Sequence, residues 1–139
     1  MGDLPKSVAI HEEGPREGFQ IEKNPIPTQS KIDLINSLSE TGLKHIQIVS
    51  FVNPKLVPGM ADAEDVVKGI KIHPNVHYTA LWLNERGLMR ALANERLHLI
   101  GSIALTASEQ FLIRNQGRTL AQNLSDQRRQ VEVYLKHDV

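Results

Sequence analysis

An arginine, a carboxylate and an amide lie close together in the stretch GPREGFQ near the N-terminus. Arg16 and Glu17 follow a glycine and a proline, and Gln20 comes a few residues later. A guanidinium group can stabilise an oxygen that becomes negative during a reaction, and a glutamate is a suitable ligand for Mg²⁺ or Mn²⁺. The stretch therefore predicts chemistry on an oxygen-rich substrate. In the alternative interpretation, Arg16 pairs with neighbouring glutamates on a solvated loop and the single carboxylate holds no metal.

The elements that must position these residues alternate between strand and helix patterns. Alternating or β-branched runs predict strands at 8–12, 45–52, 76–83 and 98–105, and helical periodicity predicts helices at 28–42, 63–73, 84–95 and 119–136. The stretches 12–28 and 106–119 are expected to be loops. This order predicts a parallel sheet with helices outside, either an open doubly wound sheet or half of a (β/α)8 barrel, which takes about 250 residues.

Polar residues are concentrated after the predicted strands, where ligands bind in α/β proteins. They are Arg16, Glu17 and Gln20, then Ser50, Asn53 and Lys55, then Asn84 and Arg86, and finally Ser108, Glu109, Arg114 and Asn115. Lys55 follows Pro54 in a stiff loop, so it can face a carboxylate or a phosphate of a carrier. In the alternative, this loop only covers the end of the sheet and tucks its apolar side chains into the core.

Composition limits the classes of function. The 139 residues are 40% hydrophobic, which is enough for a single domain over residues 1–139. Sixteen basic residues balance sixteen acidic ones without a basic run, so neither nucleic acid nor a membrane surface is an expected partner. The lack of cysteine excludes disulfides and thiolate chemistry. We find no signal peptide and no long apolar run, and therefore expect a cytoplasmic protein. The six histidines show no metal-binding spacing, and the four within or beside predicted strands, His11, His45, His77 and His98, are expected to be packed.

Four motifs carry a resemblance to a known family. GPREGFQIEK, SFVNPKLVPGMAD, LNERG and ASEQFLIRN resemble, in order and spacing, the first half of the 3-hydroxy-3-methylglutaryl-CoA (HMG-CoA) lyases, from about Val8 to the last helix. The resemblance implies a (β/α)8 TIM barrel, of which this chain supplies about four βα units. It also implies cleavage of HMG-CoA, or of a related 3-hydroxyacyl-CoA, to acetyl-CoA and a keto acid with Mg²⁺ or Mn²⁺, and a place in leucine catabolism.

The resemblance also implies roles for individual residues. Arg16 matches the family's catalytic arginine and Gln20 a glutamine of the same motif, while Glu17 stands where the family has a metal-binding aspartate. Gln47 replaces the family's usual glutamate, and the loss of that charge should leave Arg16 less well balanced and attract a metal ion less strongly. The residues expected to bind substrate are Glu12, Gln47, Ser50, Lys55, Asn84 and Asn115.

Partners follow from the incomplete barrel. The family's remaining metal ligands and its reactive cysteine lie in the second half of the barrel, outside this chain. A half barrel exposes two sheet edges and an apolar face, so we expect a homo-oligomer or a complementary barrel half in addition to the small-molecule acyl-CoA substrate. The alternatives are a non-catalytic truncated homologue that acts through protein–protein association, and a related Claisen-type acyltransferase.

Overall fold

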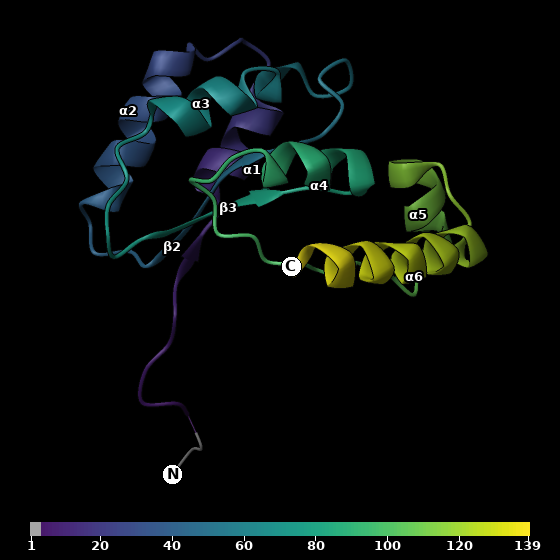
Figure 1. The fold of residues 1–139 in the computed structure, drawn as a ribbon. Helices are drawn as coiled ribbons and strands as arrows, with labels where there is room; N and C mark the ends of the chain where they lie inside the picture. Colours follow the sequence, from purple (N-terminus) through teal and green to yellow (C-terminus); the bar gives the residue numbers. More distant parts are fainter. Residues whose placement is uncertain (1–3) are drawn as a thin grey trace. The chain divides into compact units, whose positions relative to one another are not determined.

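Three parallel strands form the centre of the first part of the chain (Figure 1). The computed structural model describes residues 4–139, and the chain divides into two compact units, Met1–Leu99 and Ile100–Val139. The strands β1 (His11–Glu12), β2 (His45–Ser50) and β3 (His77–Leu81) lie in the order β1-β2-β3. His45 pairs with His11 on one side and with His77 on the other. Because parallel neighbours need a crossover connection, helices join the strands.

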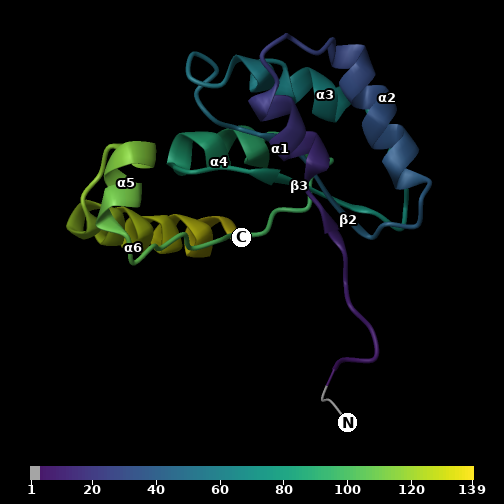
Figure 2. The same ribbon diagram turned by 180° about the vertical axis from the view of Figure 1, so that it is seen from behind.

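The helices of the first unit follow the strands in alternation. They are α1 (Gly14–Ile21), α2 (Thr28–Ser39), the short 3-10 helix η1 (Pro58–Met60), α3 (Ala63–Gly69) and α4 (Glu85–Leu92). Both ribbon views show α2 and α3 side by side over the sheet (Figure 2). On β2, Ile46 and Ile48 are fully buried, whereas the alternate residues His45 and Gln47 are half-buried. The period of two that is typical of a strand therefore holds over these four residues. It ends at an irregularity between Gln47 and Val49, beyond which Val49 and Ser50 are both buried.

A tyrosine hydroxyl ties β3 to the helical layer. Tyr78 is fully buried, and its hydroxyl donates to Ser39 Oγ of α2 at 2.8 Å and lies 3.3 Å from the Lys71 carbonyl oxygen. The same oxygen accepts from the His73 backbone N–H at 3.2 Å. A buried hydroxyl needs such partners, since leaving it unpaired costs free energy.

The second unit contains two helices, α5 (Glu109–Gln116) and α6 (Leu120–His137). Thr119 begins α6 with a capping box, in which its side chain and that of Gln122 each accept from the other's backbone N–H. An extended segment precedes these helices and is bonded to side chains of α6. The Tyr134 hydroxyl donates to the Ser102 carbonyl oxygen at 3.2 Å, and the Ala104 N–H donates to Gln127 Oε1 at 3.1 Å.

Predictions of local structure are wrong in two regions before the helix α5, and a third error concerns α5 itself. The stretch after β1 is the helix α1 rather than a loop, because a proline is compatible with the first turn of a helix, where its missing N–H is not needed. Residues 98–105 do not form a fourth strand. Only the His98 N–H reaches β3, donating to the Tyr78 carbonyl oxygen at 2.7 Å. Beyond His98, side chains of α6 form hydrogen bonds with backbone groups that would be paired with a neighbouring strand in a sheet.

Several boundaries also differ from the sequence patterns. The predicted loop 106–119 contains α5, whose first turn is capped by Ser108. The helix predicted at 119–136 is confirmed as α6, and Asn84 caps α4. Within residues 4–139, no helix has the length and apolar character needed to cross a bilayer.

Candidate functional site

Arg16 lies on α1 and is only 9% exposed, with a polar group on each side of its guanidinium. Its Nε donates to Gln47 Oε1 on β2 at 2.7 Å. Nη1 lies 2.7 Å from Glu17 Oε1, and Nη2 donates to Glu13 Oε2. The neutral partner fixes the inner end of the guanidinium, while two carboxylates occupy the outer nitrogens.

This arrangement combines both interpretations of Arg16. The arginine does pair with nearby glutamates, yet it is buried and held by a residue from a different element. The carboxylates of Glu13 and Glu17 are 49% and 58% exposed, so they can move away at little cost, since exposed ion pairs contribute little to stability. The loss of charge at Gln47 does not leave Arg16 unbalanced, because these two carboxylates compensate it.

Gln20 and Ser50 connect the last turn of α1 to the end of β2. The Ser50 hydroxyl is fully buried and donates to Gln20 Oε1 at 2.6 Å. At the other end of α1, Glu12 Oε1 accepts from the Gly14 backbone N–H. Glu12 therefore shapes the turn from β1 into α1. Together with the Arg16–Gln47 bond, these contacts fix α1 beside the carboxyl end of β2.

The described residues do not fit a metal site by themselves. No group of three or more histidine, aspartate or glutamate side chains in residues 4–139 is arranged to hold a metal ion. Glu17, the predicted ligand, is paired with Arg16 instead. Glu17 alone would supply only part of the octahedral set of six oxygen ligands that Mg²⁺ prefers.

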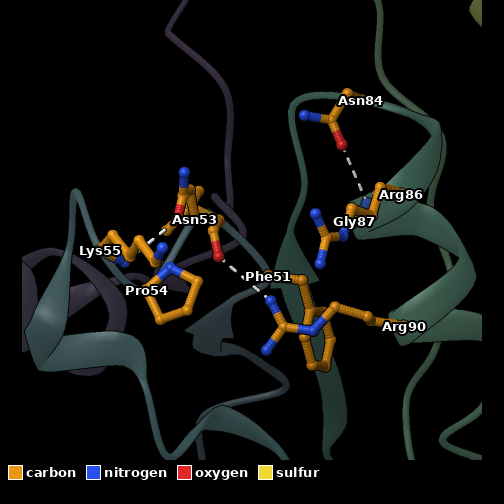
Figure 3. Close-up of a pocket in the computed structure, with 9 residues that line it drawn as sticks. Phe51, Asn53, Pro54, Lys55, Asn84, Arg86, Gly87 and Arg90 are labelled. Atoms are coloured by element: carbon orange, nitrogen blue, oxygen red, sulfur yellow. Dashed lines mark hydrogen bonds between the residues drawn. The ribbon is translucent and has the colours of Figure 1, made fainter.

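A second polar region is a pocket of about 480 Å³ beyond the carboxyl ends of β2 and β3 (Figure 3). Its lining consists of Phe51, Val52, Asn53, Pro54, Lys55, Asn84, Arg86, Gly87 and Arg90. In the close-up, Lys55 lies on one side, and Arg86 and Arg90 lie on the α4 side. Three cationic side chains at one pocket favour an anionic ligand.

The pocket walls are themselves held by polar contacts. Arg90 makes two bonds with Glu64 of α3, at 2.6 and 2.9 Å, and donates to the Val52 carbonyl oxygen at 3.1 Å. The hydrogen bonds from Arg90 lower the pKa of Glu64 below its ordinary value. Asn84 Oδ1 accepts from the Gly87 N–H at 3.0 Å, so its oxygen is used to cap α4. Arg90 was not predicted as a pocket residue from the sequence. Its spacing from Asn84 indicates only that it lies on a polar face of the helix.

The predicted site residues therefore form two neighbouring groups and one outlier. The first group lies around α1 and the end of β2 and consists of Arg16, Glu17, Gln20, Gln47 and Ser50. The second group, Lys55 and Asn84, lines the pocket that begins at Phe51, the residue after Ser50. Glu12 lies at the start of α1. Asn115 is the outlier because it is an exposed residue of α5 and belongs to the second unit.

Comparisons with known proteins agree with this architecture. No family model matches the chain. The mitochondrial HMG-CoA lyase of Rattus norvegicus is 49% identical over 115 residues, which cover 83% of this chain and 35% of the relative. The solved HMG-CoA lyase of Bacillus subtilis superposes with a TM-score of 0.83 at 39% identity, covering 97% of this chain and 45% of that one. An HMG-CoA lyase from Acinetobacter baumannii in complex with coenzyme A and 3-methylmalate superposes with a TM-score of 0.78 at 37% identity, covering 91% and 41%.

The strand order and the polar loops at the carboxyl ends thus define a partial (β/α)8 barrel, as predicted. Within that class, the chain is similar to the HMG-CoA lyases over most of its own length. It spans about a third of the length of the curated relatives that it matches.

Proposed function

We propose that this chain contributes the arginine-bearing part of the active site of a carbon–carbon lyase. The reaction is the cleavage of HMG-CoA, or of a related 3-hydroxyacyl-CoA, to acetyl-CoA and a keto acid. The observation that carries this proposal is the buried Arg16, oriented by Gln47, in a chain 49% identical to an HMG-CoA lyase. The remaining barrel strands would complete the site.

Arg16 would act by binding an oxygen of the substrate. In the cleavage, the 3-hydroxyl group loses its proton to a base, the bond between C2 and C3 breaks, and its electron pair passes to acetyl-CoA as an enolate that then takes up a proton. Negative charge therefore develops on an oxygen. A substrate oxygen that displaced the exposed Glu13 or Glu17 carboxylate would meet the outer guanidinium nitrogen that this carboxylate occupied, already oriented by the Nε bond to Gln47.

The pocket beside Lys55 is a suitable place for the charged part of an acyl-CoA. Lys55 and Arg86 can bind phosphate or carboxylate oxygens, and the Acinetobacter baumannii lyase was solved with coenzyme A. Ser50 and Asn84 would shape the path between this pocket and Arg16. Asn115 and Glu12 remain predictions as substrate-binding residues.

Other properties of the whole enzyme are part of the same proposal. The divalent cation, Mg²⁺ or Mn²⁺, would need ligands beyond Glu17. The edges at β1 and β3 would be covered by a homo-oligomeric partner or by a complementary barrel half. Named relatives include mitochondrial and cytoplasmic lyases; we propose the cytoplasm, and a role in leucine catabolism.

The test is a cleavage assay on the chain assembled with the rest of its barrel. We expect HMG-CoA to yield acetyl-CoA, and Arg16→Lys to lower kcat about 100-fold or more while KM changes little, because lysine keeps the charge but loses the fork of donors. Arg96→Lys is a matched control, since Arg96 bonds only the Lys68 and Ile70 carbonyl oxygens. Equal turnover in wild type and Arg16→Lys would remove Arg16 from the reaction.

A non-catalytic role in protein association is the second candidate. It is favoured by the pairing of Arg16 with both Glu13 and Glu17, which occupies the outer donors. Absence of cleavage with HMG-CoA and related 3-hydroxyacyl-CoA esters in the assembled barrel would support it. Condensation in place of cleavage would instead indicate the acyltransferase alternative.

A further inference from the structure

A buried lysine joins α2 to the loop that contains η1. Lys31 is 3% exposed, and its Nζ donates to the Gly59 carbonyl oxygen and to Asp62 Oδ1, each at 2.6 Å. The other carboxylate oxygen of Asp62 accepts from the Thr28 hydroxyl at 2.6 Å. An ammonium group removed from water needs partners of this kind. The contacts therefore hold the η1 loop in one position against α2.

The same loop packs directly on the last turn of α1. A Cβ atom added to Gly59 would lie 2.3 Å from the Phe19 carbonyl oxygen and 3.8 Å from Gln20 Cα, so only glycine allows this approach. Lys31 Nζ also lies 5.7 Å from the centre of the Phe19 ring. Lys31 fixes the position of Gly59, and Gly59 directly contacts Phe19 and Gln20. Lys31 therefore also influences where Phe19 and Gln20 lie.

Helix α1 depends on such contacts for its place. It has 8 residues, and helices this short are not stable alone in water. On one side, Arg16 and Gln20 bond to Gln47 and Ser50 of β2. On the other side lie Gly59 and the Lys31–Asp62 pair. Removal of either side should let the helix shift or fray.

We propose that Lys31 and Asp62 are positioning residues for Arg16. Their buried ion pair holds η1 against the last turn of α1, and α1 in turn holds the guanidinium at Gln47. An apolar side chain at position 31 would fill the space but leave the Gly59 carbonyl and the Asp62 carboxylate without their partner. The effect on the helix stands by itself, whereas its effect on catalysis rests on the proposed function.

Amide hydrogen exchange on the full chain tests the first step. In Lys31→Met, we expect the α1 amides from Glu17 to Ile21 to exchange at least tenfold faster, while the amides of β2 and β3 keep their rates. Asp62→Asn keeps one acceptor oxygen for Lys31 but replaces the other oxygen with an NH2 donor and loses the charge, so it should give a smaller increase in the same amides. Asp62→Asn also tests the proposal if Lys31→Met does not fold.

The matched control is Glu64→Gln, which weakens an ion pair between two other elements, that of Glu64 with Arg90. It should speed exchange in α4 and leave α1 unchanged. Two results in Lys31→Met and Asp62→Asn would overturn the proposal. Faster amide exchange throughout the first unit would indicate a general loss of stability, and unchanged exchange in α1 would show that the ion pair does not hold this helix.

A kinetic experiment tests the second step in the assembled barrel. We expect Asp62→Asn to lower kcat about tenfold at unchanged KM for HMG-CoA, since a displaced Arg16 loses contacts made mainly in the transition state. If α1 loosens but kcat is unchanged, the role in catalysis is refuted. If α1 loosens in a protein that cleaves no acyl-CoA, the positioning of the helix stands and the lyase function fails.

Discussion

The imidazole rings of His11 and His45 are stacked, with centroids 4.3 Å apart and planes 7° from parallel. His77 continues the row at 5.1 Å from His45, and His98 lies 4.3 Å from His77. The strand register places the first three side by side at the starts of β1, β2 and β3. Only the first pair is stacked, since the planes of the other two pairs are tilted by 36° and 40°. Protonation would place like charges on adjacent rings.

This row of histidines should make stability depend on pH. Burial lowers the pKa of His45, and the neighbouring charges of His11 on β1, His77 on β3 and His98 after α4 lower it further. Because the folded state then binds protons less readily than the unfolded state, stability should be constant above about pH 6.5 and fall as the pH drops below it. Urea unfolding between pH 5 and pH 8 measures this dependence. His45→Gln should flatten the curve, and an identical slope in that variant would contradict the assignment.

Metal binding should report on Glu17. If the assembled barrel binds Mn²⁺, Glu17→Ala should weaken that binding at least tenfold, since one carboxylate ligand is lost. Isothermal titration with MnCl₂ measures the affinity. The control is Glu22→Ala, which removes an exposed carboxylate that follows α1. Equal Mn²⁺ affinity in wild type and Glu17→Ala would exclude Glu17 as a ligand.

The pocket predicts a loss of affinity when its cations are removed. Lys55→Ala should weaken binding of coenzyme A to the assembled barrel about threefold to tenfold, because one exposed charge-assisted contact is lost. Lys44→Ala provides a control at the amino end of β2, the opposite end of the same strand. Titration calorimetry with coenzyme A and with pantetheine separates the contribution of the phosphates. A loss that is equal for both ligands would place the nucleotide elsewhere.

The Tyr78 hydroxyl should contribute strongly to the stability of the first unit. Tyr78→Phe leaves the His73 N–H and the Ser39 hydroxyl without this partner in a buried place, which costs about 1–3 kcal/mol. Urea denaturation monitored by the fluorescence of Trp82, also in the first unit, measures the change. Ser37→Ala, which removes an exposed hydroxyl bonded to the Asp33 carbonyl oxygen, should cost far less.

Two glycines near α1 should respond in opposite ways to alanine. Gly59→Ala forces a methyl group against the Phe19 carbonyl oxygen and should destabilise the chain by about 1–3 kcal/mol. Gly18 lies within α1 with nothing near its missing side chain, so Gly18→Ala should stabilise by about 0.5–1 kcal/mol through helix propensity. Unfolding free energies of the two variants settle the comparison. Similar values would show that η1 moves freely.

The sequence was most informative where a pattern repeats over many residues. The strands β2 and β3 and the helices α2, α4 and α6 follow from periodicity. The resemblance to the lyases, and the (β/α) barrel that it implied, are confirmed by the comparisons. In contrast, α1 was missed because glycine and proline end a strand and also begin a helix.

Contacts between distant segments could not be predicted from local patterns. Nothing around His98 shows that only one residue of the predicted fourth strand would pair with β3. The pairing of Lys31 with Asp62 and of Arg90 with Glu64 joins residues about thirty positions apart, as helix packing requires. The row of four histidines likewise depends on strand register, which single residues separated by a helix do not reveal.

The inner and outer nitrogens of Arg16 have partners of different charge and exposure. The accessibility of the outer nitrogens to an anion should therefore depend on ionic strength. Its inner nitrogen is bonded to a neutral, half-buried amide, and salt screens such a contact little, whereas the outer nitrogens face two exposed carboxylates that salt screens readily. Raising the salt concentration would release the carboxylates and leave the guanidinium where Gln47 holds it. The same counterions would compete with an incoming anion, so binding should be best at an intermediate concentration.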